Sequence, residues 1–339
     1  QRPAKRSIDM MPDDRAAPAV ADDALFAVAN EWQAAGHRLV FAVVIRTWGS
    51  SPRQMGSVML VRDDRTIAGS VSGGCVEGAV VDAALGMMES AGSQRLDFGV
   101  ADAAAWDVGL SCGGEISVWL VSVADGYFDA NLVRQSAAAM AARKTVGLRF
   151  DLATGQVQMI TPPAASILED MAFTLVQMPR PQLIITGAVH ISQHLAPMAM
   201  QLGFHVVVID PRRIFATADR FPGIVVHDSW PDEVLAEMVL DQDTALVTLT
   251  HDPKIDDAAL HWGLAKPLFY VACLGSRKTH AARLDRLAAA GFDGAATSRI
   301  HGPAGLDIGA KTPAEIAVSV AAELVSAYRQ RQGAVHAAG

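Results

Sequence analysis

The sequence predicts an α/β protein of two domains: an N-terminal α/β domain with glycine–cysteine loops and a C-terminal Rossmann-like domain with a doubly wound parallel sheet. Its length of 339 residues suits about two domains, and its 51% hydrophobic content supplies material for two cores. Short β-branched runs alternate strictly with helical stretches in the second half. The segment Met178-Pro179-Arg180-Pro181 favours an extended connector before that half, because proline lacks a backbone donor.

These features predict the domain boundaries. Residues 1–20 lack the apolar core of a signal peptide, so we expect a disordered tail there. No apolar run approaches the roughly 20 residues of a membrane span, so we expect a soluble, cytoplasmic protein. We expect the N-terminal domain over 21–165, a linker over 166–181, the Rossmann-like domain over 182–330 and a flexible tail over 331–339.

In the first domain, apolar residues at helical spacing predict a helix over 22–35, and Gly36 ends it as a C-terminal cap would. Short β-branched runs separated by turn residues predict the strands. The further expected elements are strands over 38–47, 56–62, 66–71, 95–98, 115–123 and 145–151, and helices over 75–91 and 128–143.

In the second domain, buried strands are expected where β-branched and aliphatic runs end in polar residues. Ile316, Val320, Leu324 and Tyr328 recur at four-residue spacing, so a helix over 313–329 is expected to dock onto its own domain. The predicted parallel strands cover 182–186, 205–209, 224–226, 244–250 and 268–273.

Charge and cysteine content exclude several classes of protein. The 28 basic and 36 acidic residues give a net charge of −8, so no broad basic field exists for nucleic acid or an anionic membrane. Three cysteines are an odd number, which argues for reduced thiols in place of a disulfide framework. Structural zinc normally needs four ligands and is not expected.

Two glycine–cysteine runs indicate chemistry. Glycines let the backbone approach a ligand and adopt positive φ, and a cysteine in such a turn is exposed to that ligand. Cys75 lies near a predicted helix N-terminus, which favours a thiolate. The alternative is that the glycines serve tight turns and the cysteines pack in the core, which is the role expected of Cys273. The runs are Gly69-Ser70-Val71-Ser72-Gly73-Gly74-Cys75-Val76-Glu77-Gly78 and Gly109-Leu110-Ser111-Cys112-Gly113-Gly114.

The second domain shows an incomplete dinucleotide fingerprint. A predicted strand runs into Gly187-Ala188-Val189-His190, and the isopropyl group of Val189 stands where a dinucleotide site has glycine. Asp210, at the end of the next strand, could accept ribose hydroxyls or simply end the strand. Ser276, Arg277 and Lys278 precede a helix and suit a phosphate, the alternative being a solvated helix start. Asp210-Pro211-Arg212-Arg213 and Thr250-His251-Asp252-Pro253-Lys254 are two further polar strand ends.

Taken together, these motifs resemble the XdhC/CoxI family from about residue 22 to about residue 328. The similar motifs of the first half are Gly49-Ser50-Ser51-Pro52-Arg53, Gly73-Gly74-Cys75-Val76-Glu77 and Gly109-Leu110-Ser111-Cys112-Gly113-Gly114. Those of the second half are Gly187-Ala188-Val189-His190, Ile209-Asp210-Pro211-Arg212, Leu274-Gly275-Ser276-Arg277 and Pro303-Ala304-Gly305-Leu306-Asp307-Ile308-Gly309-Ala310.

The resemblance implies a dimeric, non-catalytic chaperone for the molybdenum cofactor, as molybdopterin or its cytosine dinucleotide. Such a protein protects the cofactor during sulfuration by a cysteine desulfurase and delivers it to a xanthine dehydrogenase-type hydroxylase. We expect Cys75, Glu77 and Cys112 to carry the chemistry: Cys75 as metal ligand or sulfur relay, and Glu77 as a ligand, a proton carrier or only a complement to the helix dipole. Expected cofactor-binding residues are Ser50, Arg53, Gly73, Gly74, Gly113, Gly114, Gly187, His190, Asp210, Arg212, His251, Ser276, Arg277 and Lys278.

Two other functions remain open from the sequence. One is an NAD(P)-dependent oxidoreductase that uses Cys75, Glu77 and His251 on a small substrate, although Val189 counts against nicotinamide binding. The other is a scaffold that bridges desulfurase and hydroxylase without holding a cofactor.

Overall fold

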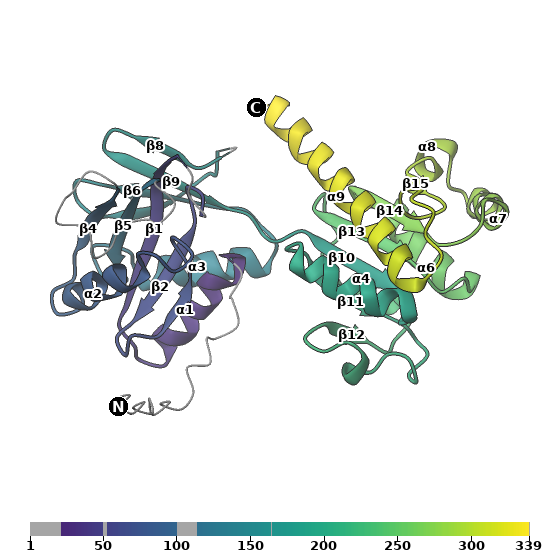
Figure 1. Cartoon of the computed structure of the whole chain (residues 1–339), viewed down its shortest axis with the longest axis horizontal. Coiled ribbons are helices and arrows are strands. Elements are labelled where there is room, and N and C mark those ends of the chain that lie inside the picture. The colour runs from purple at the N-terminus through teal and green to yellow at the C-terminus, as the bar shows by residue number, and fades with distance from the viewer. Residues whose placement is uncertain (1–21, 50–52, 100–113, 164, 339) are drawn as a thin grey trace, which may run out of the picture. The chain divides into compact units, whose positions relative to one another are not determined.

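The computed structural model describes residues 22–49, 53–99, 114–163 and 165–338, with side chains described through Arg331. The chain forms two compact units, the first ending at Met178 and the second beginning at Pro179 (Figure 1). The division therefore falls within the proline-containing segment. Both units mix helices and strands, as the sequence predicted.

The first unit is built on a five-stranded antiparallel sheet in the order β3-β2-β1-β5-β4. The central strand β1 is buried from Leu39 to Ile45, because its apolar residues face layers on both sides of the sheet. The strands are β1 (Leu39–Trp48), β2 (Val58–Arg62), β3 (Ile67–Gly69), β4 (Ser93–Phe98) and β5 (Glu115–Ser122).

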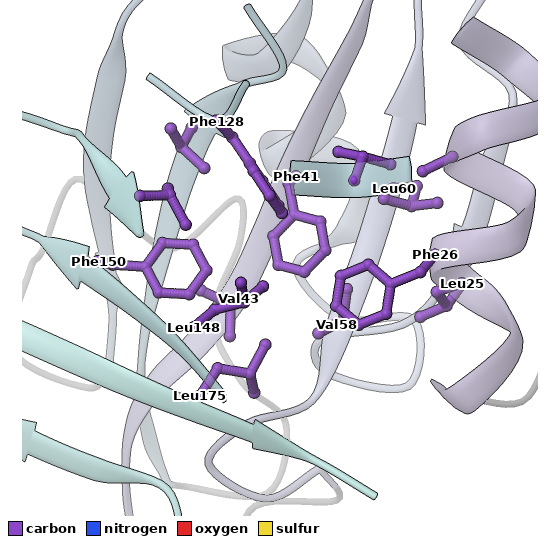
Figure 2. Close-up of a cluster of buried hydrophobic side chains, with 14 of the residues drawn as sticks. Leu25, Phe26, Phe41, Val43, Val58, Leu60, Phe128, Leu148, Phe150 and Leu175 are labelled. Atoms are coloured by element: carbon purple, nitrogen blue, oxygen red, sulfur yellow. The ribbon is translucent and has the colours of Figure 1, made fainter. Parts of the chain in front are cut away.

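Helix α2 (Glu77–Met87) covers one face of this sheet, where Val80 and Ala84 pack on Val44 and Val118. Helices α1 (Leu25–Ala34) and α3 (Ala130–Ala141) and a second sheet contribute to the core on the other face. Figure 2 shows Phe41 of β1 at the centre of this core. Its ring stacks on those of Phe26 and Phe150 and meets Phe128 edge-on, at centroid distances of 5.9, 6.0 and 5.2 Å.

The second sheet differs from the sequence prediction. Its order is β7-β6-β9-β8, with β6 (Val146–Asp151), β7 (Val157–Ile160), β8 (Ile167–Glu169) and β9 (Ala172–Gln177). Strands β8 and β9 occupy most of the segment expected to be a linker over 166–181. The reason is that Phe173 and Leu175 of β9 are fully buried when β9 pairs with β6, so this segment completes the first core.

The second unit has a six-stranded sheet in the order β12-β11-β10-β13-β14-β15, and every adjacent pair is parallel. This is the Rossmann strand order, whose ligand crevice lies where the order reverses, between the ends of β10 and β13. The strands are β10 (Gln182–Thr186), β11 (His205–Ile209), β12 (Val225–His227), β13 (Thr244–Thr248), β14 (Tyr270–Cys273) and β15 (Ile300–His301).

Helices cover both faces of this sheet (Figure 1). Helices α4 (His190–Gln201) and α9 (Pro313–Ala338) pack on one face, and α5 (Pro231–Glu237), α6 (Pro253–Leu264) and α7 (Arg277–Ala289) on the other. The short α8 (Gly294–Thr297) precedes β15. The docking face predicted for the last helix is confirmed, because Val320 and Leu324 are buried in the core with Ile316 and Tyr328 packed against it. Helix α9 also continues through most of the expected tail, to Ala338.

Among the described residues, no helix is long and apolar enough to span a membrane.

Candidate functional site

Three loops of the first unit leave the same end of its main sheet. Trp48 at the end of β1 pairs with Glu115 at the start of β5, and Phe98 at the end of β4 pairs with Ile116. Gly69, at the end of β3, pairs with Met59 near the start of β2. The segments that begin after β1, β3 and β4 therefore emerge at one end. Both glycine–cysteine runs belong to these segments, although Ser50, Cys112 and Gly113 lie outside the described residues.

The loop before α2 exposes its cysteine. Gly73 and Gly74 have φ angles of 82° and 117°, which side-chain-bearing residues rarely adopt. Cys75 follows as an exposed residue, and Val76 is the N-cap of α2. Helix α2 therefore begins at Glu77, two residues after the predicted start at Cys75. Cys273, by contrast, is buried in the core as expected, and burial raises the pKa of its thiol to about 11.

The Glu77 carboxylate fixes the shape of this loop. Oε1 accepts hydrogen bonds from the Ser70 hydroxyl at 2.6 Å and from the amides of Ser72 and Gly73 at 2.9 and 3.0 Å. Oε2 accepts from the Ser72 hydroxyl and, at 2.8 Å, from the Gly74 amide. The Ser72 hydroxyl also accepts from the amides of Cys75 and Val76, each at 3.0 Å. One carboxylate and one hydroxyl therefore hold the backbone that presents Cys75.

These contacts decide what Glu77 and the glycine amides can do. Burial alone would raise the pKa of Glu77, but the hydrogen bonds from Ser70 and Ser72 outweigh it and lower the pKa to about 2. A carboxylate that stays ionised with both oxygens occupied is a poor proton carrier or metal ligand. The contacts favour a positioning role for Glu77, and they commit the amides of Gly73 and Gly74 to Glu77 in place of the expected cofactor anion.

The outer side of the same loop has the opposite polarity. In a trans peptide the carbonyl points away from the amide of the following residue. Because the amides of Ser72, Gly73 and Gly74 point to Glu77, the carbonyls of Val71, Ser72 and Gly73 are directed away from it. Gly73, Gly74 and Cys75 are exposed. Val71 and Ser72 are fully buried, so of these three carbonyls only that of Gly73 belongs to an exposed residue and offers a ligand N–H group an acceptor beside the thiol.

Arg53 ties this loop to the segment after β1. Its Nε donates to the Ser70 carbonyl at 3.1 Å, and its Nη2 forms an ion pair with Asp22 at 2.8 Å. The expected cation is thus close to the Cys75 loop, where it supports the backbone. Gly114, the described end of the second glycine–cysteine run, is buried immediately before β5.

The low pKa of Glu77 predicts a pH dependence of stability. Its pKa of about 2 in the folded chain lies below the ordinary 4.5, so its stabilising contribution is complete above about pH 5 and is lost as the pH falls toward 2. We expect the difference in unfolding free energy between wild type and Glu77→Gln to be constant from pH 7 to pH 5 and to shrink by pH 3. Urea unfolding at these pH values measures it, and a difference independent of pH would contradict this assignment.

In the second unit, Asp210 is occupied by the protein itself. Its side chain is fully buried, with Oδ2 accepting from the Ala188 amide at 2.8 Å. Arg212 donates to both carboxylate oxygens, at 2.9 and 2.7 Å, and its guanidinium lies 4.8 Å from the centroid of the Phe215 ring. Burial opposes ionisation of Asp210, but the Arg212 hydrogen bonds lower its pKa overall. These bonds leave Asp210 poorly placed to accept ribose hydroxyls.

The loop after β10 packs tightly against the loop after β13. Gly187 has a φ of 108°, and a Cβ built on it would lie 2.7 Å from the Thr250 methyl carbon in the loop after β13. Val189 is the N-cap of α4, and the exposed His190 begins the helix. The Thr250 methyl group thus takes the space that a side chain at residue 187 would need. A dinucleotide pyrophosphate would approach residue 189, where the isopropyl group of Val189 replaces the second glycine of the fingerprint and disfavours that mode of binding.

The remaining predicted residues lie at neighbouring strand ends of this unit. His251 is exposed with a φ of 63°, a strained value for a residue with a side chain. Ser276 is the N-cap of α7, with its hydroxyl accepting from the Thr279 amide at 3.2 Å. Arg277 and Lys278 are exposed in the first turn of that helix. His251 and the α7 residues belong to one unit, whereas Cys75 and Glu77 belong to the other.

Sequence reasoning missed several polar residues. Within the described ranges no group of three or more histidine, cysteine, aspartate or glutamate side chains is arranged to hold a metal, so a metal contact by Cys75 remains a prediction. Ser70 and Ser72 were not singled out, although their place in a glycine run before a helix-starting glutamate is a usable signal. Arg283 and Asp256 are buried charges on α7 and α6. Sequence alone could have indicated their burial, because Arg283 lies on the same helix face as the apolar Leu287, and Asp256 on the same face as Leu260.

Comparisons with known proteins agree with this architecture. Residues 32–99 match the XdhC and CoxI family, and residues 183–324 match the XdhC Rossmann domain. The molybdenum cofactor insertion chaperone PaoD of Escherichia coli K12 is 30% identical over 302 residues, covering 89% of this chain and 86% of that protein. A Bacillus subtilis 168 protein, described as a probable component of xanthine dehydrogenase, is 27% identical and covers 86% of this chain and 93% of its own length.

A solved structure shares the fold over nearly the whole chain. It is a crystal structure of a protein described as a xanthine dehydrogenase, from Bacillus halodurans. The TM-score is 0.69 at 26% identity, over 92% of this chain and 97% of that one. Given this agreement and the identity with PaoD over most of both chains, this protein belongs to the XdhC and CoxI family.

Proposed function

We propose that this protein is a chaperone for the molybdenum cofactor. It binds molybdopterin at the Cys75 loop, protects it during sulfuration by a cysteine desulfurase and delivers it to a xanthine dehydrogenase-type hydroxylase. The observation that carries the proposal is the exposed Cys75 on a loop held rigid by Glu77. Similarity to a molybdenum cofactor insertion chaperone supports it, and the family resemblance adds a homodimeric state.

The residues of the loop suit this cargo. Sulfur is a soft ligand, and the exposed Cys75 presents its sulfur just before the first turn of α2. A pterin ring carries several N–H donors along its edge, and the carbonyl of the exposed Gly73, directed away from Glu77, is an acceptor for one of them. In this arrangement Cys75 contacts the metal or its sulfur, the Gly73 carbonyl orients the ring, and Glu77 keeps both in place.

The oxidoreductase alternative has less support. A nicotinamide dinucleotide needs a bare backbone at the second glycine of the turn after β10 and a free carboxylate after β11. Here Val189 stands at that glycine position, and Asp210 is held by Arg212 and the Ala188 amide. The other alternative is a scaffold that holds no cofactor. It differs from the chaperone in one measurable property, since only the chaperone should contain a pterin after purification.

Cofactor extraction tests the proposal directly. We expect the chain, expressed with the molybdenum cofactor pathway and purified without oxygen, to release a pterin that becomes fluorescent on oxidation. Wild-type chain from cells unable to make molybdopterin is the control for background fluorescence. A nicotinamide in place of the pterin would favour the oxidoreductase, and no released cofactor, with partner binding intact, would favour the scaffold.

A further inference from the structure

The second unit buries an arginine whose charge is incompletely neutralised. Arg283 of α7 is only 2% exposed, and its Nη2 donates to the Leu274 carbonyl at 2.9 Å. Its Nε and Nη1 have no hydrogen-bond partner among the described residues. Burying a guanidinium with unmade hydrogen bonds is costly, so this arrangement calls for a functional explanation.

The nearest carboxylate does not close a tight ion pair with this arginine. Asp256 Oδ2 lies 3.9 Å from Arg283 Nη2 and has no hydrogen-bond partner in the described part of the chain. Its Oδ1 accepts a hydrogen bond from the Thr250 hydroxyl, at 2.6 Å. Burial also raises the pKa of Asp256. The neighbouring Asp257 is already paired with Arg286, at 2.6 Å.

The guanidinium lies directly against the turn that starts α7. Side chains on a helix lean toward its N-terminus, which brings the Arg283 head back to Leu274 and Gly275. A Cβ built on Gly275 would lie 3.2 Å from Thr279 and 3.9 Å from Arg283 Nη2. Because Gly275 has no Cβ and adopts a φ of 141°, the turn packs directly against the side chains of Thr279 and Arg283.

The turn itself has the donors of an anion site. The Thr279 amide donates a hydrogen bond to Ser276 Oγ, whereas the described residues supply no acceptor for the amides of Arg277 and Lys278. Helix α7 spans 13 residues, so its N-terminus carries a substantial partial positive charge. The exposed side chains of Arg277 and Lys278 add two mobile cations. Positive charge therefore converges on this turn from the helix, its surface and the buried Arg283.

We propose that the turn Gly275–Thr279 binds a phosphate or diphosphate group, with the first-turn amides, Arg277 and Lys278 as its contacts and Arg283 as a positioning residue. This site is separate from the Cys75 loop and goes beyond the proposed chaperone function. It also differs from the usual pyrophosphate position after β10, where Val189 stands in place of the second glycine of the fingerprint. The phosphate comes either from a free nucleotide or from a phosphorylated cofactor.

Titration calorimetry on the full-length, cofactor-free chain tests the site. Inorganic pyrophosphate and cytidine diphosphate are expected to bind, and cytidine is not. Arg277→Ala combined with Lys278→Ala is expected to raise the Kd of pyrophosphate at least tenfold. The matched control, Lys266→Ala with Lys311→Ala, removes two exposed cations elsewhere in the same unit and should leave the Kd unchanged.

The role of Arg283 has its own comparison. Arg283→Lys, which keeps the charge, is expected to retain more pyrophosphate affinity than Arg283→Met, whereas a merely structural role predicts equal affinity at equal thermal stability. Should the Arg283 variants fail to fold, the double variant at the exposed Arg277 and Lys278 still tests whether the turn binds pyrophosphate. No binding of pyrophosphate, or equal binding by the double variant, would overturn the proposal. Binding of both ligands with tighter cytidine diphosphate points to a nucleotide source, and equal affinity to a phosphorylated cofactor.

The outcome is independent of the chaperone proposal. Pyrophosphate binding is measured without pterin, and pterin release is measured without added phosphate. If the chain releases pterin but does not bind pyrophosphate, the phosphate site has failed. If it binds pyrophosphate but releases no pterin, the chaperone proposal has failed.

Discussion

Cys75→Ala is expected to abolish cofactor loading of the partner hydroxylase while leaving the chain folded. The side chain is exposed, so its removal should change the free energy of unfolding by no more than about 0.5 kcal/mol. The loop is expected to keep its shape, because Glu77 and the Ser72 hydroxyl, which the substitution leaves in place, hold its backbone. Hydroxylase activity after incubation with the loaded chain, together with pterin content, measures the effect.

Cys273→Ala is the matched control for this experiment. Cys273 is buried against the second core, so its removal is expected to destabilise that unit by on the order of 1 kcal/mol through a small cavity. Pterin content and hydroxylase activation should stay at the wild-type level. Activation by Cys75→Ala equal to wild type would remove thiol contact at this position from the proposed function.

Glu77→Gln is expected to loosen the Cys75 loop and weaken cofactor binding without removing any atom that touches the cofactor. The amides of Ser72, Gly73 and Gly74 and two serine hydroxyls converge on the carboxylate. A glutamine keeps one acceptor oxygen and adds a donor, so several of these groups lose their partner, at a cost on the order of 2 kcal/mol. Faster hydrogen exchange at these amides and a lower pterin content are the expected results.

The reactivity of the Cys75 thiol separates a positioning role from a merely stabilising one. We expect the alkylation rate of Cys75, followed by peptide mass spectrometry, to change in Glu77→Gln under conditions where the chain remains folded. Glu89→Gln is the control, since it neutralises an exposed carboxylate just beyond the other end of α2. An unchanged alkylation rate and pterin content in Glu77→Gln would leave Glu77 with no part in the site.

The sequence predicted the second unit better than the first, for a physical reason. Strands β10 and β11 have the predicted bounds, because a parallel strand buried on both faces appears as a continuous aliphatic run. Strands β7 and β8 were not predicted, since they are short and half exposed, and β9 was assigned to a linker. Their stability comes from pairing with β6 and from a core shared with β1, which is distant in sequence.

By itself the sequence determined the fold class and the motifs that carry the family resemblance. These properties depend on local periodicity, turn chemistry and residue spacing. Only the tertiary structure decided the roles of the side chains: Glu77 holds the glycine amides, Asp210 holds Ala188 and Arg212, and Thr250 packs against the turn at Gly187. A polar side chain bonds whichever partner the folded chain brings within about 3 Å, and that partner is set by packing, which motif spacing does not encode.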